Sequence, residues 1–406
     1  MLKQVPTLDL RKHIALGGCR TLTKHDKPRR PISREFVPIS KPLIGDEEIR
    51  AANEVLRSGM LRQGEKTRTF EEIFSEHVGS EYACATSSGT ASLHIAYMAT
   101  LKGGDEVIVP DFTFFSTAST VMYTEGIPVF ADVDPETFTI DVENLKEKIT
   151  NKTRAIVPVH LFGNSADLRP ILEIAKEKKL IVISDAAQAL GTRYNAADVG
   201  SYPDIVCYSF YPTKNITTCE GGMITTNEQE LDSKFRLLRE HGQSSRYIHG
   251  ILGLNYRMTD VEAAIGIEQM KKLDWFLEKR RSNAEYLTEN LGRFGTIDTP
   301  YVEASVNHSF NQYTIKLDLE QLTCSRDKFA DFLRRENIGS AVYYPKPLHL
   351  QPVFMELLRT KEGICPVSEE LAGRVLSLPI HPSLTQNDLE NIWRAVEKAI
   401  GLCSRD

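Results

Sequence analysis

Apolar positions between residues 104 and 226 follow two patterns that alternate along the chain. Short runs rich in β-branched residues, such as LIVIS (180–184), DIVCYSF (204–210) and MITT (223–226), are separated by stretches in which apolar residues recur at helical spacing. Continuous apolar strands alternating with helices are typical of a mostly parallel sheet that is covered on both faces. The pattern therefore predicts an α/β fold with a mostly parallel central sheet flanked by helices.

Helical spacing also appears on either side of this region. Residues 46–57 predict an entry helix. Thr259 and Glu262 form a capping-box pattern, in which the two side chains satisfy the backbone donors at a helix start. We expect a long helical stretch to open there and to run to about residue 291, near Gly292. Such a helix would link two lobes of the molecule.

These patterns divide the chain into three parts. Residues 1–35 carry nine Lys/Arg against three Asp/Glu and predict a basic, mobile extension or an arm on a partner subunit. The acidic residues and prolines in it do not suit a transit peptide. We expect a large domain over residues 36–291, which includes the entry helix, and a smaller α+β domain over residues 292–406.

Lys214 lies in a short loop between two of the predicted strands, in the segment YPTKNITTCEGG (211–222). Burial disfavours the charged ammonium, and a neutral amine is a nucleophile that forms Schiff bases. A solvated surface lysine is the common alternative, since most lysines are exposed. Lys214 is therefore a candidate covalent anchor for a carbonyl compound such as pyridoxal phosphate (PLP).

Asp185 directly follows the apolar run LIVIS (180–184), so it lies at the carboxyl end of a predicted strand. Open α/β sheets bind their ligands at this edge. PLP chemistry requires a carboxylate that keeps the pyridine nitrogen protonated. The alternative is a helix N-cap for the residues that follow. Together, Asp185 and Lys214 favour a PLP site.

A third segment, ACATSSGTASLHIAYMATL (83–101), has the pattern of a phosphate site. A short apolar strand leads through Ser88, Gly89 and Thr90 into a helical pattern, and a helix start offers free N–H groups and a favourable dipole to an anion. Ser209 is a further candidate donor. An ordinary capped helix is the alternative for this segment.

Several motifs in order resemble one protein family. The stretches are SSGTASLHIA (87–96), GDEVIVPDFTF (104–114), PVFADVDPETF (128–138), VPVHLFGNSAD (157–167), ISDAAQALGTRY (183–194), SFYPTKNITTCEGG (209–222), GLNYRMTDVEAAIG (253–266), YYPKPLHLQ (343–351) and RVLSLPIHPSLT (374–385). The chain, from about residue 36 to its C-terminus, resembles the DegT-type (DegT/DnrJ/StrS) family of PLP-dependent sugar aminotransferases, which have fold-type I of the aspartate aminotransferase superfamily.

The resemblance implies a role for each matching residue. Lys214 is the lysine of the Schiff base (aldimine), and Asp185 is the partner of the pyridine nitrogen. Gln188 is expected at the phenolic oxygen of PLP, and Phe114 on the face of its ring. The expected phosphate contacts are Gly89, Thr90 and Ser209, with Asn255 reaching in from the neighbouring subunit of a homodimer. The expected substrate-pocket residues are His160, Asn164, Arg257 and His349, although a lone histidine is as often structural.

Cys219 departs from the family pattern, which commonly has glycine before Glu-Gly-Gly. If this position has a positive φ, a cysteine there is strained by about 1–3 kcal/mol. The substitution affects the geometry of the Lys214 loop and leaves the chemistry unchanged.

The resemblance also implies the reaction. Glutamate donates an amino group and leaves as a keto acid, and the aminated cofactor then passes that group to a nucleotide-linked keto-sugar in a ping-pong cycle. Residues 215–222 (NITTCEGG) favour a 4-keto-6-deoxy sugar over a 3-keto sugar. Dehydration of a sugar is an alternative, but Lys214 argues against it because that branch carries histidine there. A non-catalytic regulatory or structural homologue is the other alternative.

Composition and charge restrict the partners and the cellular location that we expect. A net charge of -6 argues against a nucleic-acid partner. No run approaches the roughly 18 apolar residues that a membrane helix needs, and no secretory signal is evident. Seven cysteines without a C-x-x-C pair fit a reducing cytoplasm better than a disulfide framework. We therefore expect a cytoplasmic enzyme without a metal.

Overall fold

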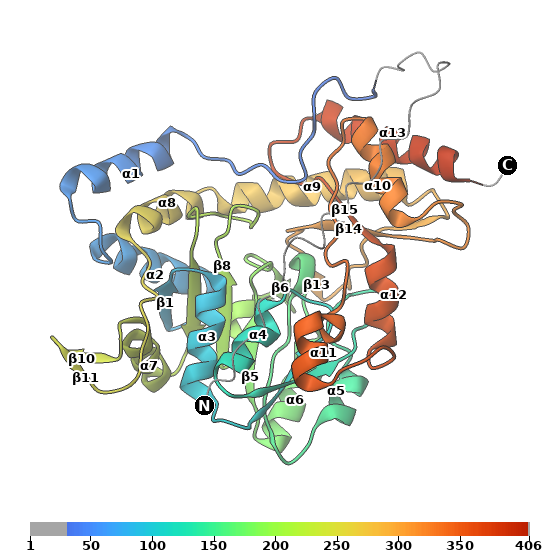
Figure 1. The fold of residues 1–406 in the computed structure, drawn as a ribbon. Coiled ribbons are helices and arrows are strands. Elements are labelled where there is room, and N and C mark those ends of the chain that lie inside the picture. Colours follow the sequence, from blue (N-terminus) through green and yellow to red (C-terminus); the bar gives the residue numbers. More distant parts are fainter. Residues whose placement is uncertain (1–30, 405–406) are drawn as a thin grey trace, which may run out of the picture.

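The computed structural model describes residues 31–404 and has a mixed α/β architecture (Figure 1). Within these residues the largest sheet has seven strands in the order β1-β9-β8-β5-β4-β2-β3. Their bounds are β1 Tyr82–Thr86, β2 Glu106–Pro110, β3 Ile127–Ala131, β4 Thr153–Ile156, β5 Ile181–Asp185, β8 Ile205–Ser209 and β9 Gly222–Thr226. Neighbours pair in parallel except β9, which runs antiparallel to both β8 and β1. The predicted mostly parallel sheet is confirmed.

Helices cover both faces of this sheet because successive strand residues point to opposite sides. Val107 packs with helices on one face and Ile108 with helices on the other. The first face is covered by α3 (Gly89–Thr100), α4 (Ser116–Tyr123) and α7 (Gln229–Arg239), and the second by α2 (Glu65–Val78), α5 (Val142–Lys148), α6 (Leu168–Lys178) and α8 (Asp260–Met270). Both faces of the sheet are therefore shielded from water, which explains the continuous apolar runs of the strands.

The capping box predicted at Thr259 and Glu262 is present and opens α8. The expected long helix is interrupted at Lys271 and Lys272, after which α9 (Leu273–Leu291) continues to the predicted end. Figure 1 shows α8 and α9 end to end, with the entry helix α1 (Asp46–Ser58) beside α8. The start of α9 packs in the core of the large sheet and its end in a separate C-terminal core, so this helix joins the two.

The C-terminal core is built on a small antiparallel sheet of β12 (Ile297–Asp298), β14 (Tyr313–Leu317) and β15 (Val375–Leu378). Helices α10 (Arg326–Arg335) and α13 (Gln386–Cys403) pack in this core. The remaining elements of residues 31–404 are short: α11 Pro352–Leu358, α12 Pro366–Arg374, β6 Arg193–Tyr194, β7 Ala197–Asp198, β10 Gln243–Ser245, β11 Ile248–His249, β13 Val306–Asn307 and 3₁₀ turns at Leu161–Gly163, Val199–Ser201 and Leu348–Leu350. The C-terminal core combines strands and helices, so the predicted α+β character of this part is confirmed.

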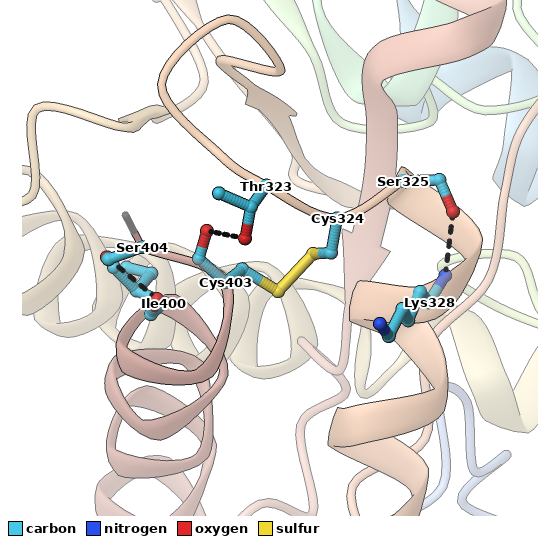
Figure 2. The surroundings of a disulfide bond; sticks show 7 residues. All are labelled: Thr323, Cys324, Ser325, Lys328, Ile400, Cys403 and Ser404. Atoms are coloured by element: carbon cyan, nitrogen blue, oxygen red, sulfur yellow. Dashed lines mark hydrogen bonds between the residues drawn. A yellow bond between two sulfur atoms is a disulfide. The ribbon is translucent and has the colours of Figure 1, made fainter. Parts of the chain in front are cut away.

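One disulfide differs from the expectation that the cysteines stay reduced. Cys324 precedes α10 and Cys403 ends α13, with their Cα atoms 5.3 Å apart (Figure 2). The backbone N–H and the hydroxyl of Thr323 donate to the Cys403 carbonyl, at 2.6 and 2.7 Å, and hold the same two segments together. The pair is 79 residues apart, so no local spacing signals it. In the described part, Cys84, Cys207, Cys219 and Cys365 are free.

Residues 1–30 of the predicted N-terminal extension lie outside the described residues. Within residues 31–404, no helix combines the length and the apolar character that crossing a bilayer requires.

Candidate active site

A cavity of about 560 Å³ lies at the carboxyl edge of the large sheet. Asp185 ends β5, Ser209 ends β8, and the start of α3 directly follows the loop after β1. Because β5 and β8 pair in parallel, their carboxyl ends open to the same side. The predicted residues that line this one cavity are Gly89, Thr90, Phe114, Asp185, Gln188, Ser209 and Lys214.

Lys214 reaches this cavity from the loop between β8 and β9. Its backbone N–H donates to the Tyr211 carbonyl at 2.9 Å, which closes a turn and fixes the start of the side chain. Burial lowers the pKa of Lys214 to about 8, and the charge of Asp185 opposes this shift without cancelling it. A substantial fraction of the amine is therefore neutral near physiological pH, as a nucleophile requires.

Asp185 is held from two sides at the floor of the cavity. Its Oδ1 accepts from the Ala187 N–H at 3.0 Å and its Oδ2 from the Thr117 hydroxyl at 2.9 Å. Burial raises the pKa of the carboxyl, whereas both hydrogen bonds and the nearby Lys214 favour its charged form. A turn follows Asp185 in place of a helix, so the N-cap alternative does not apply.

Close backbone approach explains the glycine at the phosphate-like helix start. A Cβ on Gly89 would lie 2.7 Å from the Cβ of Ser209, closer than two carbons can pack. Ser88 caps α3 by accepting from the Ala91 N–H at 3.1 Å, so the capped-helix alternative also holds. The N-terminus of α3 and the hydroxyl of Ser209 face the same cavity, which suits a phosphate group.

Gln188 and Phe114 line the same cavity. Gln188 accepts from the Phe162 N–H at 2.8 Å and donates to the Tyr344 hydroxyl at 3.0 Å, so its amide orientation is fixed. The Phe114 side chain is 54% exposed into the opening, with its ring centroid 6.1 Å from that of Tyr344. An aromatic face and an oriented amide above a carboxylate fit the ring of PLP.

Other lining residues were not identified from the sequence. They include Gln312, Tyr343 and Tyr344, which come from the C-terminal part and close the outer wall. Thr117, which holds Asp185, lies on α4, more than sixty residues away in sequence. Only long-range packing brings these residues to the site, so local sequence patterns carry no signal for them.

Two predicted residues lie near each other but outside this cavity. Asn255 is exposed and forms an isolated β-bridge with Glu240. The Arg257 guanidinium pairs with the Glu240 carboxylate at 3.0 Å. Neither side chain contacts the Lys214 cavity of its own chain.

The other three candidate substrate residues are buried away from the cavity. His160 is fully buried, and its Nδ1 accepts from the Ala166 N–H at 3.2 Å. Asn164 lines a different hollow. His349 lies between the carboxylates of Asp111, at 2.6 Å, and Glu369, at 3.1 Å. Within one chain these residues hold structure around the site.

Cys219 adopts φ +74°, the left-handed conformation that favours glycine. Its backbone N–H donates to the Thr217 hydroxyl at 3.0 Å, so the strained turn is held in place. Because φ is positive at Cys219, the strain expected for a cysteine at this position is present. Its cost of about 1–3 kcal/mol falls on the loop that carries Lys214.

Comparison with known proteins gives one consistent result. The model of the DegT/DnrJ/EryC1/StrS aminotransferase family matches residues 42–397. GDP-perosamine synthase from Caulobacter vibrioides is 39% identical, over 82% of this chain and 89% of that protein. The UDP-N-acetyl-3-dehydro-alpha-D-glucosamine 3-aminotransferase of Acidithiobacillus ferrooxidans is 37% identical, over 88% and 95%. The solved structure of DesV from S. venezuelae, in complex with a ketimine intermediate, superposes with a TM-score of 0.83 at 31% identity, over 87% and 94%.

The family match covers the residues that build the cavity, and the cavity has the parts that PLP needs. These are an amine with a lowered pKa, a buried carboxylate, the N-terminus of a helix and aromatic side chains. The chain belongs to the DegT/DnrJ/EryC1/StrS aminotransferase family and is a sugar aminotransferase that uses PLP.

Proposed function

We propose that this enzyme moves an amino group from glutamate to a nucleotide-linked 4-keto-6-deoxy sugar by a ping-pong mechanism. The observation that carries the proposal is the placement of Lys214 and Asp185 in one cavity, with an amine pKa lowered to about 8 beside a buried carboxylate. PLP, when bound, supplies an electron sink that stabilises negative charge at the reacting carbon.

Lys214 has two tasks in this proposal. Its neutral amine would hold the cofactor through the aldehyde group of PLP. Once the amino donor has taken that place, the same amine would remove a proton at the donor's α-carbon as a base and return a proton as an acid. A pKa of about 8 suits both directions of transfer near neutral pH.

Asp185 and Gln188 orient the ring. The charged Asp185 carboxylate keeps the pyridine nitrogen protonated, and its hydrogen bond from Thr117 fixes the direction of the acceptor oxygen. Gln188 is the partner proposed for the phenolic oxygen. Its amide is already oriented by Phe162 and Tyr344, so little reorganisation is needed when the ring binds.

The acceptor sugar is proposed from family relatives and from the loop that carries Lys214. Two relatives at 37–39% identity are named for nucleotide-linked sugars, and one of them for amination at carbon 3. The outer part of the cavity, with Tyr211, Glu220 and Tyr343, offers aromatic faces and one carboxylate to a sugar.

We propose a homodimer whose sites are shared. Asn255 is exposed outside the cavity of its own chain, where it is available to a second copy. Nearby, the β10–β11 hairpin and its flank expose Tyr247, Ile248 and Leu252, the last 91% exposed. A second copy that covers this apolar surface would bring Asn255 to the partner's phosphate site.

The test is an amination screen with the full-length enzyme. Glutamate and PLP are supplied with a panel of nucleotide-linked 3-keto and 4-keto-6-deoxy sugars, and the aminated product is detected by mass spectrometry. We expect turnover of a 4-keto-6-deoxy sugar and none in Lys214→Ala. Turnover confined to 3-keto sugars would overturn the acceptor assignment, and wild-type protein without an absorption band from bound PLP would overturn the mechanism.

A further inference from the structure

A second, smaller cavity lies on the other side of the Lys214 loop. It has a volume of about 20 Å³ and shares Lys214 with the cofactor cavity. Its lining comes from the segment before α1, from the Lys214 loop, from α8 and α9, and from the turn after β15: Ser40, Lys41, Pro42, Leu43, Pro212, Lys214, Asn215, Thr217, Gln269, Phe276, Arg280 and Pro382. The proposed reaction uses none of these residues except Lys214.

The residues that line this cavity carry positive charge and no negative charge. Its lining contains the cations Lys41 and Arg280 beside the partly neutral amine of Lys214, and no carboxylate among the described residues lines it. The nearest carboxylate connected to it by hydrogen bonds is Glu48, which accepts from Gln269 at 2.8 Å. Lys272 pairs with Glu48 at 2.8 Å and neutralises it. The cavity therefore carries an unbalanced positive charge.

Arg280 is the clearest sign of a missing partner. It is 4% exposed, and its Nη1 donates to the backbone carbonyls of Phe310 and Asn311 at 3.1 and 3.3 Å. Within residues 31–404 it has no carboxylate partner, and its buried Nε–H has no acceptor. Buried arginines are normally paired, because an uncompensated buried charge destabilises the fold.

Arg280 and Lys41 also act on a neighbouring side chain, His381. Burial, followed by the charge of Arg280, lowers the pKa of His381 to about 4; Lys41 acts in the same direction, whereas the Pro38 carbonyl and Asp388 oppose the shift. The imidazole of His381 forms hydrogen bonds with the Ser383 hydroxyl and the Pro38 carbonyl, and it adds no negative charge. The region therefore favours an anion over a cation or a neutral molecule.

We propose that this cavity binds one monovalent inorganic anion of the size of chloride. A volume of 20 Å³ exceeds the roughly 10–15 Å³ that one water-sized particle needs and is too small for a phosphate or an amino-acid carboxylate. Arg280 and Lys41 supply the charge, and the Arg280 Nε–H, which has no acceptor among the described residues, is the free donor. Exposed Lys41 forms the entrance.

The bound anion would act on Lys214 from the side opposite Asp185. Lys214 is then flanked by Asp185 in the cofactor cavity and by the anion, Lys41 and Arg280 in the small one. An anion favours the ammonium form of a neighbouring lysine. Chloride should therefore shift the pH dependence of Lys214 acetylation by acetic anhydride to higher pH in the cofactor-free protein, as read by mass spectrometry.

The direct test uses bromide, which replaces chloride and scatters X-rays anomalously. Crystals of the full-length PLP-bound enzyme are soaked in sodium bromide, and we expect an anomalous peak in contact with Arg280. In solution, the melting temperature should rise with bromide and saturate, with sodium gluconate holding the ionic strength constant. Lys41→Gln should weaken this bromide response by about two- to fivefold.

Lys361→Gln is the matched control, because Lys361 is also exposed and lies far from this cavity in the fold. Arg280→Lys should abolish the peak; if that variant does not fold, Lys41→Gln carries the test. The proposal would be overturned by an electron-density peak at Arg280 that has no anomalous signal and fits a water molecule. Equal bromide responses in the Lys41 and Lys361 variants would overturn it too. Neither result bears on the amination assay, so the two proposals fail independently.

Discussion

Burial and the Asp185 carboxylate shift the pKa of Lys214 in opposite directions. Their balance sets the pH above which the amine is neutral and can react. Burial lowers its pKa to about 8, compared with about 10.4 for a free lysine. The rate at which cofactor-free protein captures PLP should therefore rise with pH to a midpoint near 8, measured by stopped-flow absorbance. Asp185→Asn removes the opposing charge and should move the midpoint lower. A midpoint near 10 would contradict the burial of this amine.

Thr117 is a positioning residue for the ring, because it acts through Asp185. Thr117→Val removes the hydroxyl that donates to the carboxylate at 2.9 Å and keeps the shape of the side chain. The loss of a hydrogen bond to a charged group should weaken PLP binding about tenfold or more. Equilibrium dialysis of PLP measures this, and Thr117→Ser should bind PLP as the wild type does. Equal affinity in the valine variant would rule out the role.

Cys219 stores strain that a glycine would release. Cys219→Gly should raise the free energy of unfolding by about 1 kcal/mol, since about 1–3 kcal/mol of strain is relieved and part of the gain is lost to the greater entropy of glycine in the unfolded chain. Urea unfolding measures the change. Cys219→Ala keeps the Cβ and should show no such gain. Equal stabilisation by both substitutions would mean that the thiol, and not the backbone conformation, destabilises the wild type.

At the level of elements, His349 ties the end of β2 to α12. Its imidazole lies between Asp111 and Glu369. Burial alone would lower the pKa of His349, but the two carboxylates outweigh it and raise the pKa. A histidine with a raised pKa stabilises the fold fully below its unfolded pKa of about 6.5, and this contribution disappears as pH rises through the folded value.

The stabilisation of the wild type relative to His349→Gln should therefore shrink as the pH rises from 6 to 8. Differential scanning calorimetry at both pH values measures the difference. Burial lowers the pKa of His160 and His308 to about 3 and that of His381 to about 4, so these histidines stay neutral in the folded protein and make its stability rise with pH. This contribution is the same in the wild type and the variant, and it cancels when the two are compared. Parallel pH curves for wild type and variant would show that His349 does not carry the effect.

Helices and strands were predictable where a local sequence pattern determines them. Strands β5 and β8 are buried on both faces, so apolar runs identified them, and the hydroxyl and carboxylate of Thr259 and Glu262 fixed the start of α8. The break at Lys271 was not predictable, because the helical pattern continues on both sides of it. Tyr344 and Thr117 were missed for a different reason: each reaches the site only through packing of distant segments.

For the whole molecule, the Cys324–Cys403 disulfide closes the C-terminal core, as Figure 2 shows. A crosslink that spans 79 residues restricts the unfolded chain and typically adds about 2–4 kcal/mol. Dithiothreitol should therefore lower the stability of this core. Trp393 on α13 packs against the core, and its ring lies 4.8 Å from the Arg293 guanidinium, so its fluorescence reports on this region.

The measurement uses a Trp275→Phe background, in which Trp393 is the remaining tryptophan. The guanidinium midpoint of Trp393 fluorescence should fall when dithiothreitol is added and should stay constant in Cys403→Ser. PLP absorbance monitors the large sheet in the same titration. It should respond less, because Lys214, Asp185 and Ser209 belong to the other core, although Gln312 and Tyr344 close the site from the C-terminal side. If both signals shift equally, the two cores unfold as one cooperative unit, and the disulfide stabilises the active site as well.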